Sequence, residues 1–476
     1  MALITGERNQ ISFLPPSIED YVGLDDPVRA YDAFVDHIDI TSLGLDADVD
    51  RVGAPEFDPV VMLKLLVYGY SYGLRSSRKL ERATHHNLSF IWLTGGLRPD
   101  HKTIARFRRD NKDALKKVLK QCARLCAKLG LMAGNTLFID GTKMKANASL
   151  EKTWTDKRCQ DALKKVDTRI EEILAECEAT DEAEANEGSL TKMKEELKNA
   201  NVLKAKIQEI VKELHETQKT SFNTTDPDCN KVKGRQGVQA GYNMQSVVDD
   251  QNGLVVSTDV VSDNNDLNQF SSQVNQANET LATSCQTACA DAGYANTDEL
   301  KIIDDQQIQV VVPSQKQATE AALGPFDKAK FTYDSANDCY VCPEGQSLSY
   351  RSTNQEKNTK KYLAARPAAC RVCRHFGVCT TSPQGRGITR LVNEEVKERL
   401  EAQFDRPECQ AIFKRRKARA EHPFGHLKWN LGVKHFLLRG LNGVKAEASL
   451  LFTGFNLKRT ISILGVHGLI QAMETT

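Results

Sequence analysis

The stretch TLFIDGT at residues 136–142 decides the fold that the sequence predicts. It joins a short apolar run to Asp140, and Gly141 follows at once. Such a run predicts a buried strand whose last side chain is a carboxylate at the edge of a sheet. Gly141 would let the backbone turn away there and let a ligand come close. An isolated Asp-Gly pair is more often a hairpin turn, so partners elsewhere in the chain must decide.

Length, composition and charge limit the classes of protein that the chain can form. Of its 476 residues, 40% are hydrophobic and 27% charged, which is ordinary for a globular protein of two or three domains. The formal net charge is +1, so affinity for nucleic acid would depend on local basic patches. No apolar run approaches the roughly 20 residues that span a bilayer, and residues 1–16 lack a secretory signal pattern. We therefore expect no membrane partner, and 13 cysteines kept in a reducing cytoplasm.

Residues 1–133 are expected to form a helical domain. Asp-Pro pairs at 26–27 and 58–59 are typical of helix starts. Between residues 98 and 128 the chain has eleven Lys or Arg and three Asp. These cations recur at helical spacing beside apolar residues, which favours a helix that packs on one side and faces phosphates on the other. The predicted DNA-binding residues are Arg106, Arg109 and Lys116, and a solvated charged face is the alternative.

Helical spacing also predicts an antiparallel pair of helices at residues 151–220. Apolar positions recur at steps of three and four on both sides of the acidic stretch 178–188. Nothing in this segment indicates chemistry, so it is expected to be an insertion with an acidic tip that avoids DNA.

Strand patterns return after this insertion. An Asn-Gly turn joins the first two strands and predicts a β-hairpin. The expected elements are a strand at 238–248, a strand at 254–261, a helix at about 267–283, a strand at 287–290 ending beside Asp291, a helix capped by Asn296 or Thr297 and extending to Asp304, and a strand at 308–312. This order resembles a ribonuclease-H-like sheet. The predicted fold class is therefore α/β: a mixed-sheet catalytic core with an all-α N-terminal domain, a helical-hairpin insertion and a zinc-ribbon-like insertion.

Asp140 and Asp291 have matching surroundings, because each follows apolar strand residues and precedes turn residues. On neighbouring strands the two carboxylates would project from one end of the sheet, where their repulsion favours a cation between them. Magnesium prefers oxygen ligands and binds phosphate. Two such ions about 3.5–4 Å apart suit in-line displacement at phosphorus. The pair therefore predicts a site for two Mg²⁺ ions.

A third carboxylate is expected from a helix near the C-terminus. Glu421 is the only acid between residues 410 and 440, inside a strongly basic segment. A salt-bridging role is the alternative, but a metal and phosphate site needs one such acid among several cations. Lys428 follows Glu421 by two helical turns on the same face. The predicted phosphate-binding residues of this segment are Arg415, Arg416, Lys417, Arg419 and Lys428.

Two Cys-x-x-Cys pairs match the knuckles of a structural zinc ribbon. The predicted zinc ligands are Cys339, Cys342, Cys370 and Cys373. The interval between the pairs is long, which implies an extended hairpin, and Cys379 or His375 could replace one ligand. Free cysteines in a loop are the alternative. Zinc would fold a module that is too polar to be stabilised by burial alone.

Together these blocks resemble the DDE transposases of bacterial insertion sequences, in the group whose last acid lies in a Tyr-Arg-Glu-Lys helix. The Asp140 strand, Asp-Ala-Gly-Tyr at 291–294 and Glu-His-Pro-Phe-Gly at 421–425 match the three catalytic blocks. Residues 225–228 and 241–243 match flanking blocks, and the cysteine cluster stands where such transposases often carry one.

The sequence departs from that group near its last acid. Phe413 stands where the group usually has tyrosine, and Phe413 and Arg416 lie one residue further upstream of Glu421 than is common. Pro423 is expected to kink or restart the helix.

The resemblance implies an enzyme that binds the inverted repeats of its element, nicks DNA by hydrolysis and transfers a strand. Asp140, Asp291 and Glu421 would hold magnesium, while Lys428 and its neighbouring arginines would hold phosphates. The implied partner is double-stranded DNA at the element ends and the target, bound by a homodimer in the bacterial cytoplasm, in association with the nucleoid. A metal-dependent nuclease without strand transfer and a non-catalytic DNA-binding protein derived from a transposase are the alternatives.

The expected domains follow from these assignments. They are a helical DNA-binding or assembly domain at 1–133, the first parts of the core at 134–150 and 221–313, the helical hairpin at 151–220, the zinc-ribbon-like insertion at 314–400, and helices that complete the core at 401–476.

Overall fold

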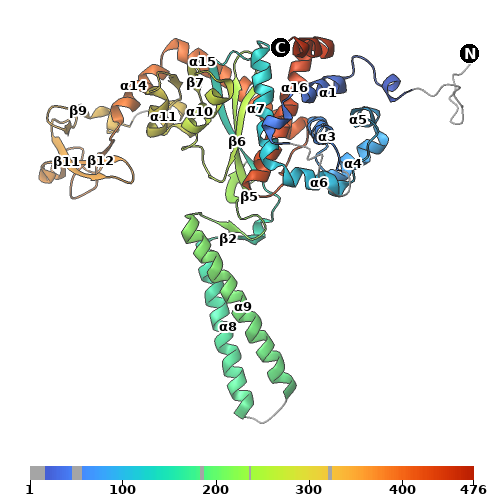
Figure 1. The fold of residues 1–476 in the computed structure, drawn as a ribbon. Helices are drawn as coiled ribbons and strands as arrows, with labels where there is room; N and C mark the ends of the chain where they lie inside the picture. The colour runs from blue at the N-terminus through green and yellow to red at the C-terminus, as the bar shows by residue number, and fades with distance from the viewer. Residues whose placement is uncertain (1–16, 46–55, 183–186, 235–236, 320–323, 476) are drawn as a thin grey trace, which may run out of the picture. The chain divides into compact units, whose positions relative to one another are not determined.

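A computed structural model describes residues 17–45, 56–182, 187–234, 237–319 and 324–475 (Figure 1). The chain divides into two compact units, and each is described by itself. The first unit contains residues 1–266, 273–285 and 417–476, and the second contains 267–272 and 286–416. The predicted absence of a secretory signal at residues 1–16 lies outside the described residues.

The N-terminal part of the first unit is helical, as predicted. Its elements are η1 (Ile18–Tyr21), α1 (Pro27–His37), α2 (Ile40–Leu43), α3 (Pro59–Ser71), α4 (Ser77–His86), α5 (Leu88–Leu93), α6 (His101–Asp110) and α7 (Lys112–Lys128). The two Asp-Pro pairs begin helices, because Asp26 and Asp58 accept hydrogen bonds from backbone N–H groups in the first turns of α1 and α3. The C-terminal helix α16 (Leu441–Glu474), which is interrupted by a kink at Gly465, packs against α1, α3 and α7.

The strands of the first unit pair in antiparallel fashion around β5 (Gly237–Asp249). Its partners are β1 (Thr136–Lys145), β4 (Asn230–Gly234) and β6 (Val255–Val261). The predicted hairpin between β5 and β6 is confirmed, and its Asn-Gly turn has Gly253 at φ +65°.

The prediction that the first strand ends at Asp140 is wrong. Strand β1 continues for five residues beyond Asp140, and its pairing with β5 is regular from Leu137 to Lys145. Asp140 therefore lies in the middle of the strand, opposite Ser246. The Asp-Gly pair is no turn here, because the ladder to β5 satisfies the backbone hydrogen bonds on both sides of it.

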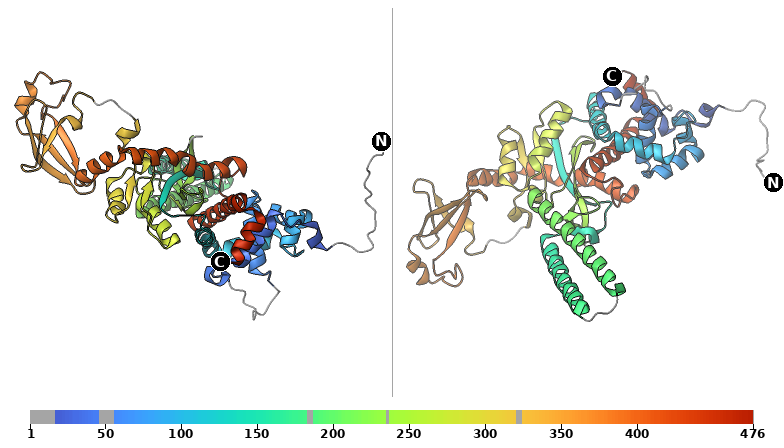
Figure 2. Two further views of the ribbon diagram at one scale, coloured as in Figure 1. Left: turned by 90° about the horizontal axis from the view of Figure 1, so that it is seen from above. Right: turned by 60° about the horizontal axis from the view of Figure 1, so that its bottom comes forward.

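The helical hairpin is also confirmed. Helices α8 (Asp156–Glu182) and α9 (Glu187–Thr217) lie side by side in Figure 1 and in the right view of Figure 2. A small core at their base contains Cys159, Ile207, Ile210 and Leu214. The short strands β2 (Thr153–Trp154) and β3 (Phe222–Asn223) pair beside it. The tip at residues 183–186 lies outside the described residues.

The second unit begins with a small α/β part. Strands β7 (Thr287–Cys289) and β8 (Gln309–Val311) are parallel. Between them lie η3 (Ala292–Tyr294) and α11 (Thr297–Asp304), which Asn296 caps as predicted. Helix α10 (Phe270–Leu281) carries residues of both units, as does α15 (Pro407–Gly425). The short elements α12 (Gln315–Thr319) and η4 (Lys328–Lys330) and the helix α14 (Glu394–Phe404) complete this part.

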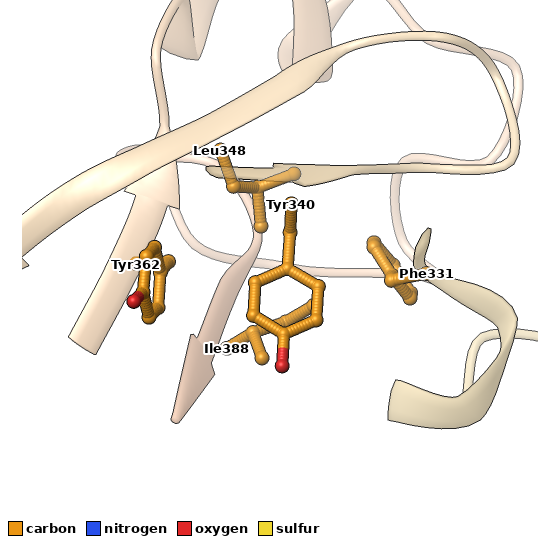
Figure 3. Close-up of a cluster of buried hydrophobic side chains, with 5 residues drawn as sticks. All are labelled: Phe331, Tyr340, Leu348, Tyr362 and Ile388. Carbon is orange, nitrogen blue, oxygen red and sulfur yellow. The ribbon is translucent and has the colours of Figure 1, made fainter. Parts of the chain in front are cut away.

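A five-stranded antiparallel sheet forms the rest of the second unit. Its order is β13-β12-β11-β10-β9, from the strands β9 (Thr332–Asp334), β10 (Cys339–Val341), β11 (Ser347–Asn354), β12 (Thr359–Ala364) and β13 (Gly387–Leu391). The short helix α13 (Pro367–Arg371) lies between β12 and β13. Figure 3 shows the small core of this sheet, which contains Phe331, Tyr340, Leu348, Tyr362 and Ile388.

Candidate functional site

The side chain of Asp140 occupies one face of β1. Residues 137–139 before it are fully buried, whereas Asp140 and the three residues after it are half-buried. Its Oδ1 accepts a hydrogen bond from the backbone N–H of Gly141 at 2.9 Å. Because alternate residues of a strand share a face, Asp140 and Thr142 point to the same side of the sheet.

Lys428 reaches that same face. Its Nζ donates to Oγ1 of Thr142 from η5, a π-helical turn (His426–Asn430) that directly follows α15. A π-turn is rare and is frequently found at functional sites. The hydrogen bond brings an ammonium group within two strand residues of Asp140, as a phosphate-binding lysine next to a catalytic carboxylate would require.

Glu421 lies in the last two turns of α15 and is half-buried. Its neighbour Ala420 is fully buried, and the ring of His422 packs edge-on against Phe455 at 5.4 Å between centroids. Burial, together with the positive charge of Arg459, lowers the pKa of His422. The helix is not restarted at Pro423, because α15 runs on to Gly425 and the π-turn begins only after it.

Asp291 belongs to the second unit and follows β7. Its Oδ1 accepts a hydrogen bond from the N–H of Gly293 at 2.8 Å and caps the short helix η3. A guanidinium nitrogen of Arg416 lies 4.0 Å from its Oδ2, and that guanidinium also lies over the ring of Phe413 at 5.6 Å. Phe413 therefore holds Arg416 by its ring face, although it lacks the hydroxyl of the usual tyrosine.

A cluster around Asp266 was missed by the sequence analysis. Its Oδ1 accepts hydrogen bonds from Asn243 at 2.6 Å and Gln245 at 2.8 Å, and Lys143 lies 3.3 Å away. In the β1–β5 register, Lys143 and its two polar partners occupy the face opposite to Asp140. Asp266 is therefore bound to the other side of the sheet. The only sequence signal for this cluster was the presence of three polar residues, Lys143, Asn243 and Gln245, within predicted strands.

The block at residues 225–228 has a positioning role. Asp226 accepts hydrogen bonds from the Tyr242 hydroxyl at 2.8 Å and from the N–H of Gly440 at 3.0 Å. Asp228 accepts the N–H of Leu441 at 2.7 Å. Both carboxylates thus satisfy backbone groups at the start of α16 and fix it to the sheet.

The predicted cations of the N-terminal region lie in two helices, α6 and α7. Arg106 is exposed, while Arg109 contacts Asp110 at 2.7 Å and Lys116 contacts Asp113 at 2.6 Å. The Arg109–Asp110 pair is exposed and therefore weak, whereas Lys116 is partly buried and also donates to Asn442. The buried cation of this stretch is Arg108, which donates to the Tyr70 hydroxyl at 3.1 Å and to the carbonyl of Arg75 at 2.5 Å, so its role is structural.

The basic segment of α15 likewise contains both cations that lie near acids and cations that are exposed. Arg419 lies 3.4 Å from Asp250, whereas Lys414, Arg415 and Lys417 are exposed. The exposed cations point away from the packed side of the helix, which leaves them accessible to a polyanion.

Two comparisons identify the class of protein. Residues 16–110 match a family model described as a transposase domain (DUF772), and residues 341–461 match one described as a transposase DDE domain. No curated protein matches the chain. The chain is a transposase, an enzyme that acts on DNA.

More closely, it is a DDE transposase of the insertion-sequence type. A DDE domain implies a ribonuclease-H-like core and the use of a divalent metal ion. The second match includes Glu421 and Lys428, whereas Asp140 and Asp291 lie outside both matched ranges. Among the described residues, no helix is both long and apolar enough to span a bilayer.

Proposed function

We propose that this transposase binds the terminal inverted repeats of a bacterial insertion sequence, cuts the DNA at the element ends and joins those ends to a target. The observation that carries the proposal is the hydrogen bond from Lys428 to Thr142, which links the end of the Glu421 helix to the strand of Asp140. We propose Asp140, Asp291 and Glu421 as the three catalytic carboxylates.

The chemistry of these donors fits a divalent metal. Carboxylate oxygens are the ligands that Mg²⁺ prefers, and three of them with bound waters leave positions for phosphate oxygens. Within the described part of the chain, no three acidic, Cys or His side chains are already arranged to hold a metal ion. When bound, two Mg²⁺ ions would stabilise the attacking and leaving oxygens at phosphorus.

The residues of the chain would orient two successive displacements. In the first, water attacks phosphorus at the element end and breaks a P–O bond, which frees a 3′-hydroxyl. In the second, that 3′-hydroxyl attacks phosphorus of the target strand, forms a new phosphodiester and releases a target 3′-oxygen. Lys428 would hold a phosphate oxygen beside Asp140, and Arg416 would hold one beside Asp291. Arg415, Lys417 and Arg419 would contact the backbone further along.

We further propose that a homodimer acts on the two element ends, in the cytoplasm and in contact with the nucleoid. The helical N-terminal region would bind DNA or assemble the complex. The helical hairpin, with no site residue of its own, would be an insertion into the core.

The test is a set of charge-removing substitutions. Asp140→Asn, Asp291→Asn and Glu421→Gln each keep the size of the side chain and remove the charge that holds a divalent ion. We expect each to lower cleavage of end-containing DNA by roughly 10³-fold or more, and a double variant to be scarcely worse than a single one. DNA binding and the thermal unfolding temperature should stay unchanged.

The matched controls are Glu408→Gln, an exposed acid on the same helix as Glu421, and Asp263→Asn, an exposed acid after β6. Asp249 is unsuitable as a control, because it is buried and accepts backbone N–H groups. Cleavage that survives in Asp140→Asn would refute the assignment. Cleaved ends that are never joined to a target plasmid would identify a nuclease instead of a transposing enzyme.

A further inference from the structure

We propose that Cys342, Cys370, Cys373 and Cys379 form a structural zinc site with four thiolate ligands, and that Cys339 lies outside it. This revises the ligand set that the Cys-x-x-Cys spacing predicts, in which Cys339 takes the place of Cys379. The proposal concerns the sheet of the second unit and stands independently of the proposed strand cleavage and transfer.

Strand alternation separates Cys339 from the other cysteines. Figure 3 shows that Tyr340 on β10 points into the core of the sheet, and the residue is only 2% exposed. Its strand neighbour Cys339 therefore points to the opposite face. Cys342 continues the strand pairing, since its N–H donates to the carbonyl of Gln346 at 2.9 Å, and so it shares the face of Tyr340. Cys342 and Cys379 both pack against this core.

The four proposed ligands line one small cavity. It has a volume of about 30 Å³, enough for a water-sized group or an ion and too small for an organic ligand. All four cysteines are among its lining residues.

His375 lines the same cavity but is engaged elsewhere. Its Nε2 lies 3.1 Å from Oε1 of Glu344, and its ring packs against Phe326 with 4.8 Å between centroids. Cys379 packs against the core of the sheet beside Cys342, and with Cys370 and Cys373 it completes a four-thiolate set without His375.

The backbone around the cavity has the features of a metal knuckle. The N–H of Gln346 donates to Sγ of Cys342 at 3.3 Å, and Gly345 before it turns with φ +76°. N–H donors to sulfur stabilise a ligating thiolate. Gly385 approaches Cys370 so closely that a Cβ there would lie 3.1 Å from Sγ, so the chain leaves room for this sulfur.

Charge near the site is also complementary. Zn²⁺ displaces one proton from each of four thiols, and the resulting centre carries a net charge of about −2. Arg386 donates to the carbonyls of Cys379 and Phe326 at 3.0 Å, which places its guanidinium beside this centre. Within the described residues no such group is already in ligand geometry, so the thiols must rotate to approach the roughly 2.3 Å of a Zn–S bond.

The segment that carries three of the ligands has little else to hold it. Val372 is 86% exposed and Val378 is 71% exposed, so the loop around Cys373 buries few apolar side chains. A structural zinc ion supplies folding energy where burial is insufficient.

The test compares single Cys→Ser variants of the full-length protein, purified under reducing conditions. We expect about one zinc per chain in the natural protein and in the matched control Cys339→Ser. Cys342→Ser, Cys370→Ser, Cys373→Ser and Cys379→Ser should each lose it. Cobalt in place of zinc should give the absorption of a four-thiolate centre. A natural protein that binds neither zinc nor cobalt would overturn the proposal, as would zinc that is retained in Cys379→Ser and lost in Cys339→Ser.

Alkylation of the natural protein covers the case in which a variant fails to fold. Cys339 should react with iodoacetamide whether or not a chelator is present, while the four ligands should react only after chelation. Protection of Cys339 together with a reactive Cys379 would refute the assignment. Zinc content that is normal in Asp140→Asn would show that the two proposals succeed or fail separately.

Discussion

Glu447→Gln is expected to destabilise the first unit more than any surface substitution would. Glu447 on α16 is fully buried, and its Oε1 lies 2.6 Å from a guanidinium nitrogen of Arg75, whose side chain is 9% exposed. Its Oε2 accepts the backbone N–H groups of Leu437 and Leu438 at 2.9 Å each. Glutamine keeps one acceptor and the shape of the side chain, but it leaves the charge of Arg75 buried without its counter-ion.

Breaking one side of a buried ion pair costs about 3–5 kcal/mol. At about 1.4 °C per kcal/mol for a unit of about 340 residues, the unfolding temperature should fall by about 4–7 °C. The same pair also fixes a segment that reaches β1, the strand of Asp140, because the N–H of Phe436 donates to the carbonyl of Lys145 at the end of β1. DNA cleavage at 37 °C should therefore fall along with stability.

Thermal unfolding followed by circular dichroism measures this effect. The matched control is Lys445→Gln on the same helix, whose partner Asp259 lies 2.7 Å away in a partly exposed pair, where the loss should be at most about 1 kcal/mol. Adding Arg75→Met to Glu447→Gln should restore part of the lost stability, because the buried charge is then removed. A decrease of less than about 2 °C for Glu447→Gln would refute the reasoning.

Three further outcomes are expected. Replacing Arg106, Arg109 and Lys116 by Gln should weaken DNA binding and reduce the slope of log K, the logarithm of the DNA-binding constant, against log salt by about one for each lost phosphate contact. An unchanged slope would show that these residues contact solvent and not DNA. Burial and two neighbouring cationic groups lower the pKa of His426 in the folded protein. As the pH drops below about 6.5, His426 is therefore protonated in the unfolded chain before it is protonated in the folded one, and the free energy of unfolding should decrease. The unfolding temperature of His426→Asn should depend less on pH over that interval. Gly241→Ala should lower the unfolding temperature, because a Cβ there would lie 2.4 Å from a carbonyl oxygen of β1.

Local patterns in the sequence were sufficient for most of the elements. Apolar periodicity and the two Asp-Pro starts predicted the N-terminal helices, and an Asn-Gly turn predicted the β5–β6 hairpin, because these signals act within a few residues. The end of β1 could not be predicted in this way. Asp140-Gly141 reads as a turn until residues 241–245 are known to pair beyond it, about a hundred positions later.

The residues of the candidate site likewise differ in whether local sequence was enough to predict them. Asp140, Asp291 and Glu421 could be chosen from their immediate surroundings. Asp266 could not, because its three partners lie on strands whose facing depends on register. Arg75 gave no signal either, since its counter-ion follows 372 residues later.

Because Asp140 lies in the middle of β1, the number of residues that precede it in the strand determines which face of the sheet its side chain occupies. Even-numbered and odd-numbered residues of β1 lie on opposite faces of the sheet: Asp140 and Thr142 lie on one face, and Gly141 and Lys143 lie on the other. Deleting a single residue before Asp140, with the ladder to β5 kept in place, would exchange the two faces. Lys143 would then stand on the face where we propose a catalytic carboxylate, and Asp140 would face Asp266 on the other side of the sheet. Deletion of one residue within 137–139 should thus be as damaging as replacement of Asp140, even though it removes only an apolar residue.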